Sequence, residues 1–167
     1  MRSLIVYSSK SGNTRKLAEA IHAFLPGEKM LKSVEENPDV NGFDFICVGF
    51  WFQAGKSDAK SADFLRALKG SQPLFLFATH GAAVDSDHAR NGMELARDIV
   101  SPETVIDTFT CQGEVSADFL AKAKNMNPVP PWIDGAAGAV GHPDSKDIKR
   151  LEETLEKALL RYRALYE

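Results

Sequence analysis

The sequence lacks a long apolar run and an excess of basic residues, and each lack excludes a class of function. No apolar stretch among the 167 residues approaches the ~18 residues that a membrane-spanning helix needs. The formal net charge of -3 gives no basic footprint, so we expect no nucleic-acid partner. The apolar run at 4–7 is too short for the core of a signal peptide, and we therefore expect a cytoplasmic protein.

Cysteines are scarce, and motifs for protein-borne catalysis are missing. Cys47 and Cys111 lie far apart in apolar segments, which is typical of reduced thiols that act as small core residues. No Ser-His-Asp arrangement, pair of catalytic carboxylates or zinc spacing is convincing, so we assign no catalytic residue. His88 with Asp85 and Asp87 would bind a metal from a single turn, and a solvated acidic loop is the better interpretation. We expect no metal, and any redox chemistry would belong to a cofactor.

Apolar strands that alternate with amphipathic helices make up most of the chain. Apolar residues are 44% and charged residues 26%, the balance of a globular protein, and the length suits one domain over residues 1–167. We predict strands at 3–7, 28–32, 43–50, 73–78 and 105–111. We predict helices at 13–25, 62–69 (closed by Gly70), 89–100 and 116–124, and a long helix from 145 onwards. The Pro- and Gly-rich stretch 125–144 has no periodicity. Its Trp132 is expected to pack this stretch on the body of the protein, with contact to a partner as the alternative.

The predicted strands have continuous rather than alternating apolar runs, which indicates burial on both faces. Alternation of such strands with helices favours an α/β fold, a three-layer α-β-α sandwich with a parallel sheet covered on both sides. Ligands of such sheets bind outside the carboxyl ends of the strands. The loops at 8–14, 49–57 and 79–87 each follow a strand, so we expect them to meet at that edge.

The loop at 8–14 crowds hydroxyls between a strand and a helix, as Ser8-Ser9-Lys10-Ser11-Gly12-Asn13-Thr14. A plain helix cap needs one hydroxyl, so the others indicate a ligand. The free N–H groups and the dipole at a helix N-terminus bind anions, and Gly12 lets backbone approach closely. The only charge in the loop is Lys10, and this mostly neutral cradle suits a phosphate monoester. It is neither a Walker loop nor a Gly-x-Gly-x-x-Gly motif.

The order Ser9-Lys10-Ser11-Gly12-Asn13-Thr14 resembles the FMN-phosphate loop of flavodoxins, which follows their first strand. Gly49-Phe50-Trp51 resembles their second flavin loop, where a Trp stacks on the isoalloxazine ring, and Thr79-His80-Gly81 falls where their third flavin loop begins. The resemblance extends over nearly the whole chain. It implies bound FMN, a flavodoxin-like five-stranded parallel sheet of order 2-1-3-4-5, and the short-chain type.

The resemblance also implies a set of flavin contacts beyond the phosphate loop. These are Phe50, Trp51, Phe52, Gly55, Thr79, His80 and Gly81. We place Trp51 on the flavin, because alternate residues of a strand point opposite ways and the three aromatics cannot all face the core. Gly55 is the first glycine after Trp51 and the residue freest to turn its peptide toward the ring. His80 would shift the flavin potential with pH if it titrates beside the ring.

Three functions remain open at this point. The first is an FMN-binding electron-transfer protein that works with redox partner proteins, a reductase and an acceptor. The second is an FMN-dependent reductase that acts directly on a small substrate such as a quinone or tetrapyrrole. This second function gains support because the stretch 79–91 has no aromatic other than two histidines, which would leave one flavin face more open. The third is a flavin-free interaction module of the same fold, which the retained loop hydroxyls argue against.

Overall fold

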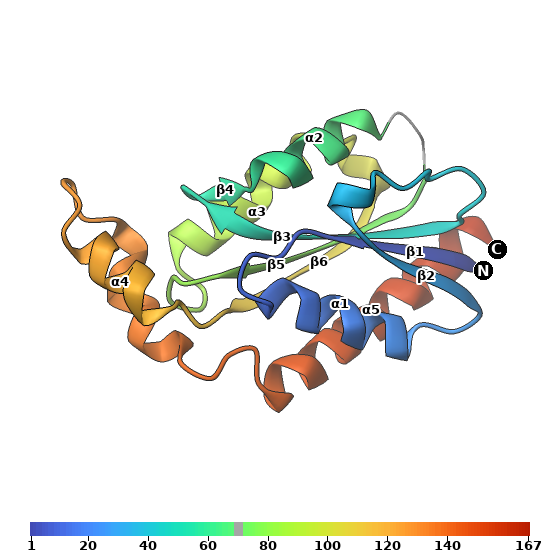
Figure 1. The fold of residues 1–167 in the computed structure, drawn as a ribbon. Helices are drawn as coiled ribbons and strands as arrows, with labels where there is room; N and C mark the ends of the chain where they lie inside the picture. The colour runs from blue at the N-terminus through green and yellow to red at the C-terminus, as the bar shows by residue number, and fades with distance from the viewer. Residues whose placement is uncertain (69–71) are drawn as a thin grey trace.

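The computed structural model describes residues 1–68 and 72–167, which form three layers (Figure 1). The central sheet contains five parallel strands in the order β2-β1-β3-β5-β6. Their bounds are β1 (Arg2–Tyr7), β2 (Glu28–Ser33), β3 (Phe45–Gln53), β5 (Leu74–His80) and β6 (Val105–Gln112). The short β4 (Lys56–Ser57) pairs antiparallel with the end of β3. The predicted parallel sheet of order 2-1-3-4-5 is therefore confirmed, with one added hairpin strand.

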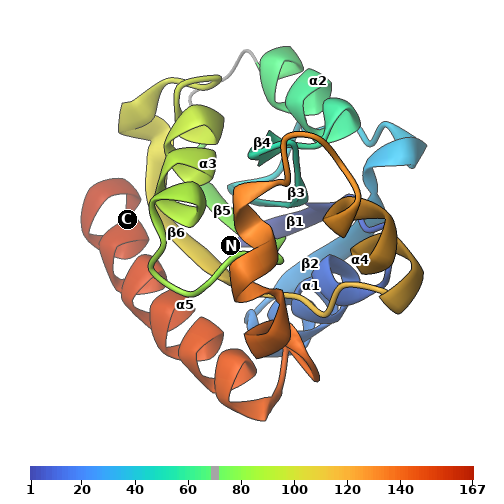
Figure 2. The same cartoon turned by 90° about the vertical axis from the view of Figure 1, so that its left-hand side faces the viewer.

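Helices cover both faces of this sheet (Figures 1 and 2). One face carries α1 (Asn13–Phe24) and α5 (Ser145–Tyr166), and the other carries α2 (Ala59–Ala67) and α3 (Asp87–Arg97). Helix α4 (Ala117–Lys124) and the 3₁₀ helix η3 (Pro131–Ala139) lie beyond the carboxyl edge of the strands. Two short 3₁₀ turns are η1 (Val34–Glu36) and η2 (Pro102–Thr104). None of the helices in the described ranges has the length and apolar character needed to cross a membrane.

The core lies on both sides of the sheet, which explains the continuous apolar runs of the strands. In β1, Ile5 packs with α1 and α5 on one side, whereas Leu4 and Val6 pack on the other side with α2 and α3. All three side chains are fully buried. Cys47 and Cys111 belong to the first side as free, buried thiols, and burial raises the pKa of each. The prediction that they serve as small core residues is confirmed.

The stretch 51–57, part of the loop expected at 49–57, instead continues β3 and forms a hairpin with β4. Gln53 pairs with Lys56, and between them Ala54 and Gly55 both have positive φ, at 51° and 78°. This is the pattern of a type I′ turn. Ala-Gly lacks the usual Asn-Gly signature of that turn, so the local sequence did not indicate it. Helix α2 then begins at Ala59, three residues earlier than predicted, because the Asp58 carboxylate accepts the Ser61 N–H and caps it.

The ends of the other helices and strands differ less from the prediction. Helix α3 begins two residues earlier than predicted, at Asp87, because Ser86 caps it, and it ends at Arg97. The stretch 125–144 is not wholly irregular, since Pro131 opens η3 there. A 3₁₀ helix has three residues per turn, and the second half of η3 consists of Gly and Ala. It therefore shows no apolar stripe at the α-helical period, and that pattern did not predict it. The predicted helix end at 69 and the stop at 70 lie outside the described residues.

The positive φ of Ala54 in the hairpin turn leads us to a prediction about the stability of the protein. Replacing Ala54 by Asn should raise the free energy of unfolding by about 1 kcal/mol, because Asn tolerates the left-handed conformation that strains Ala. The measurement is urea unfolding followed by circular dichroism. As a control, Ala121→Asn on the exposed face of α4 should lower stability by about 0.6 kcal/mol through helix propensity. An Ala54→Asn protein no more stable than the wild type would contradict this account of the turn.

Candidate functional site

Three loops meet at the carboxyl edge of the sheet, as the sequence predicted. The Ser8 N–H donates to the Gly49 carbonyl at 2.9 Å, which joins the first loop to β3. The Thr14 and Thr79 hydroxyl oxygens lie 2.9 Å apart in a buried hydrogen bond, which joins α1 to the end of β5. Figure 2 looks onto this edge, where the strand ends gather behind the crossing segment that contains η3.

The first loop has an internal framework that holds its shape. Gly12 has a φ of 93° and donates its N–H to the Ser9 hydroxyl at 3.1 Å. The Asn13 side-chain amide donates to the Ser11 hydroxyl at 3.1 Å and to the Glu114 carbonyl at 3.0 Å. The loop is therefore bonded to itself and to the segment that follows β6.

The start of α1 leaves donors available at this loop. The first hydrogen bond of the helix runs from the Lys16 N–H to the Gly12 carbonyl at 3.0 Å. The N–H groups of Asn13, Thr14 and Arg15 consequently have no carbonyl acceptor within the described helix. These three donors and the positive end of the helix dipole create a site for an anion.

A cavity of about 270 Å³ opens beside this loop, on the side of β2. It is lined by Tyr7, Ser8, Ser9, Gly12, Arg15, Ser33, Val34 and Glu35. Sequence reasoning did not anticipate Arg15 or the residues after β2, although Arg15 directly follows the predicted phosphate loop. The cavity gives a small anion room next to the helix N-terminus.

The aromatic run of the second loop divides between the core and the site. Phe50 has no exposed surface, so its side chain is unavailable to a ligand. Phe52 stacks on Phe50 at 6.3 Å and lies 5.3 Å from the His80 ring, so it serves mainly to pack β3. Trp51 is half-buried and faces the first loop, with the Lys10 ammonium 5.5 Å from its ring centre. Among the three, Trp51 is the residue placed to contact a ligand.

Gly55 lies in the hairpin turn, and the type I′ geometry of that turn requires its positive φ. A side chain at this position would meet the His88 ring of α3 at 3.2 Å. Turning the peptide between Ala54 and Gly55 would convert the turn to type II′, which favours Gly at the position that Ala54 occupies. The turn therefore resists the peptide rotation expected for Gly55.

The third loop begins with two buried polar residues. Thr79 bonds to Thr14, and the His80 Nδ1 lies 3.2 Å from the Ala82 carbonyl. Burial lowers the pKa of His80 to about 4, and the positive charge of nearby His88 adds to this lowering, whereas the bond to Ala82 opposes it. His80 is consequently neutral near pH 7. It does not supply the charge change near neutral pH that its position suggested.

Two further aromatic residues, Phe119 of α4 and Trp132 of η3, approach the site. Their rings stack with centres 5.9 Å apart and planes 5° from parallel. The Lys10 ammonium lies 5.4 Å from the Phe119 ring centre and so lies over the faces of both Phe119 and Trp51. Sequence reasoning missed Phe119, because nothing in its helix distinguishes it from a core residue.

Comparison with known proteins agrees with this geometry. The family model for the flavodoxin domain matches residues 4–156. The chain belongs to the flavodoxin family. It is 28% identical over 160 residues to the flavodoxin-like domain-containing protein BilS of Clostridioides difficile, covering 89% of this chain and 90% of that protein. It is 26% identical over 180 residues to BilS of Clostridium symbiosum, covering 93% and 94%.

Solved structures show the same flavodoxin fold. Oxidised Flavodoxin 2 from Bacillus cereus superposes with a TM-score of 0.63 at 15% identity, over 96% of this chain and 99% of that chain. A flavoprotein from Lactobacillus acidophilus in complex with FMN gives 0.54 at 18% identity, over 65% and 92%. The order of strands and helices in this flavodoxin-family protein is thus shared with proteins of low sequence identity.

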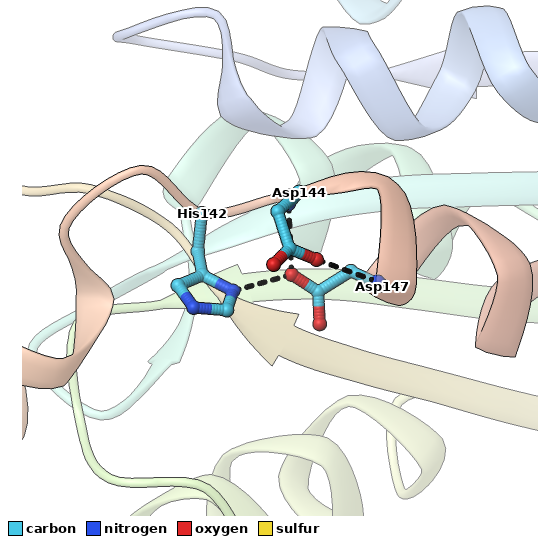
Figure 3. Close-up of side chains that lie close together, drawn as sticks. All are labelled: His142, Asp144 and Asp147. Atoms are coloured by element: carbon cyan, nitrogen blue, oxygen red, sulfur yellow. Dashed lines mark hydrogen bonds and ion pairs between the residues drawn. The ribbon is translucent and has the colours of Figure 1, made fainter.

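A histidine and two aspartates gather at the start of α5 (Figure 3). Asp147 accepts hydrogen bonds from the His142 ring and from the Asp144 N–H. Asp144 in turn caps the helix by accepting the N–H groups of Lys146 and Asp147, which lowers its pKa. Both carboxylates are thus engaged in a capping box. The group anchors α5 rather than presenting free metal ligands.

The buried His80 makes the stability of this flavodoxin-family protein depend on pH. Its folded pKa of about 4 lies below the ordinary 6.5, so the unfolded chain binds an extra proton as the pH falls from 6.5 toward 4, and stability is lost in that window. We expect the free energy of unfolding to fall by about 2 kcal/mol between pH 7 and pH 5 through this residue.

Urea unfolding at both pH values tests this expectation. His80→Asn should remove most of the pH-dependent loss, whereas His22→Asn, at the partly exposed end of α1, should leave it in place. If the two variants lose the same stability between pH 7 and pH 5, the buried imidazole is not the cause.

Proposed function

We propose that this chain binds FMN at the carboxyl edge of its sheet and transfers electrons to a redox partner protein. The observation that carries the proposal is the hydroxyl-rich loop at the N-terminus of α1, whose donors are held in place and whose ends are bonded to β3, β5 and the segment after β6. Membership of the flavodoxin family supports FMN as the cofactor, as does the FMN bound to the Lactobacillus acidophilus flavoprotein.

The donor set fits a phosphate monoester. The N–H groups of Asn13, Thr14 and Arg15 and the exposed Ser11 hydroxyl would hold its oxygens. Either hydroxyl of the Thr14–Thr79 pair can be the donor, and a hydroxyl that accepts keeps its own hydrogen for a second acceptor. Bound FMN would supply the redox chemistry, since it accepts and releases electrons that protein side chains do not carry. The role of this chain is then to bind, orient and shield that group.

Electron transfer to a protein is favoured over direct reduction of a small substrate. The reductase alternative rested on an open flavin face where the third loop lacks an aromatic residue. Phe119 and Trp132 bring aromatic surface to that side. His80 of the third loop is buried and neutral near pH 7, so it carries no imidazolium proton to give to a substrate at that pH. The intact hydroxyl loop likewise argues against a module that has lost its flavin.

The phosphate assignment predicts a selective loss of affinity. Replacing Ser11 and Thr14 together by Ala should weaken FMN binding at least about tenfold, because charge-assisted hydrogen bonds contribute ~1.5–3 kcal/mol each. Riboflavin has the same ring without the phosphate and should lose much less. The double variant Ser11→Thr/Thr14→Ser keeps both hydroxyls and should bind FMN nearly as the wild type does.

Isothermal titration calorimetry with FMN and riboflavin measures these affinities. If the Ala variant loses the same affinity for both ligands, the phosphate of FMN does not bind in this loop. Absence of FMN binding by the wild type would overturn the proposed function as a whole.

Electron transfer is tested on the FMN-loaded protein after reduction. We expect flavin absorbance to recover when the reduced protein is mixed with cytochrome c, a protein acceptor of single electrons. Recovery only with small quinones would favour the reductase alternative instead.

A further inference from the structure

Four side chains from separate parts of the chain form a row across the candidate site: Trp51, Lys10, Phe119 and Trp132. The ammonium of Lys10 lies 5.5 Å from the centre of the Trp51 ring and 5.4 Å from the centre of the Phe119 ring. The gap between Trp51 and Phe119 is therefore no wider than the sum of these distances. A flat ring between two others needs roughly 7–8 Å between the outer planes, twice the optimal carbon–carbon contact, and this lies within that limit. Both rings turn a face to the ammonium, so a planar group that replaced the ammonium would contact both.

The segment that carries Phe119 and Trp132, residues 117–139, is anchored on the third loop; we call it the α4–η3 arm. Gly135 lies so close to the Ala82–Ala83 backbone that a Cβ there would fall 2.0 Å from the Ala83 nitrogen. The Gln112 side-chain amide donates to the carbonyls of Ala82 and Gly135, at 2.8 and 3.0 Å. The arm is therefore tied to both the third loop and the end of β6.

Trp132 is placed by the same anchoring. A Cβ on Gly81 would lie 3.3 Å from the Trp132 ring, so the indole packs directly on the start of the third loop. Phe119 then stacks on Trp132 and remains 43% exposed. An aromatic ring that is held by a stacked neighbour and still partly exposed is suited to receive a planar ligand.

We propose that Phe119, backed by Trp132, is the second wall of the flavin site, and that the isoalloxazine ring enters between Trp51 and Phe119 in place of the Lys10 ammonium. This inference rests on the proposed binding of FMN. The Lys10 side chain runs from the phosphate loop into the gap, so the gap lies one lysine length from that loop. The five-carbon ribityl chain of FMN spans a comparable distance.

Lys10 thereby exchanges one interaction for another. Without ligand, its ammonium lies over two ring faces, each an attractive but modest contact at an exposed site. A large flat ring system buries far more apolar surface in the same gap. The displaced ammonium remains attached to the phosphate loop, where a phosphate dianion is its natural partner.

The wall is tested by measuring FMN and riboflavin affinities of Phe119→Ala. Both ligands should bind about tenfold more weakly, and by the same factor, because the ring that Phe119 contacts is common to them. Val129→Ala removes a similarly exposed apolar side chain from the same arm outside the row, and it should bind both ligands as the wild type does. Far-ultraviolet circular dichroism checks that each variant is folded.

The displacement of Lys10 is tested by Lys10→Ala with the same two ligands. Riboflavin should bind about threefold more tightly or better, because its ring no longer displaces an ammonium from the gap. FMN should gain less, because it loses a charge partner for its phosphate. Lys122→Ala, an exposed lysine of α4, removes the same charge without these effects.

Each outcome decides the inference. The equal loss in Phe119→Ala together with the tighter riboflavin binding of Lys10→Ala supports it. Unchanged affinities in Phe119→Ala, or riboflavin binding that stays the same or weakens in Lys10→Ala, overturn it while FMN binding by the chain stands. A wild-type protein that binds neither ligand overturns this inference and the proposed function together.

Discussion

The hydrogen bonds that hold the N-terminus of α1 against the strand ends are the constraint on which the candidate site depends. The first loop bonds to Gly49 of β3, to Thr79 of β5 and to Glu114 just after β6. An anion site at a helix N-terminus needs its N–H groups aimed at one point, and this requires a fixed helix end. The central strands supply that fixity, because they are buried on both faces and do not shift within a close-packed core.

The same sheet edge also sets the surroundings of a ligand. Phe50 and Phe52 are used to pack β3, which leaves Trp51 as the aromatic residue turned toward the first loop. On the opposite side, the α4–η3 arm brings Phe119 and Trp132 over the third loop. The site therefore has aromatic surface on two sides, although the third loop itself contributes only a buried, neutral histidine. This arrangement fits the proposed electron carrier, because aromatic surface would cover the flavin from two sides.

The residues that lead into the capped start of α5 lie just after the arm and are hydrogen-bonded to the segment that follows β6. The Gly141 N–H donates to the Glu114 carboxylate, and the Glu114 N–H donates to the His142 carbonyl. Glu114 thus joins the residues just after the arm to the first loop, because its own carbonyl accepts the Asn13 amide. Asp147 then holds His142 at the start of the last helix (Figure 3). A series of hydrogen bonds therefore connects the start of α5 to the first loop.

Much of this protein was determined by the sequence alone, because local patterns report burial and capping. Continuous apolar runs indicated strands covered on both faces, and the hydroxyl-rich loop from Ser9 to Thr14 indicated an anion site before a helix. The hairpin at Ala54–Gly55 and the helix η3 were missed, since their residues carry neither the usual turn signature nor an apolar period. Only the tertiary structure decided that Phe119, stacked on Trp132, shares the Lys10 ammonium with Trp51. That meeting depends on Gly135 packing against the third loop and on the Gln112 side chain that bonds to both, and contacts between such distant segments leave no trace in local periodicity.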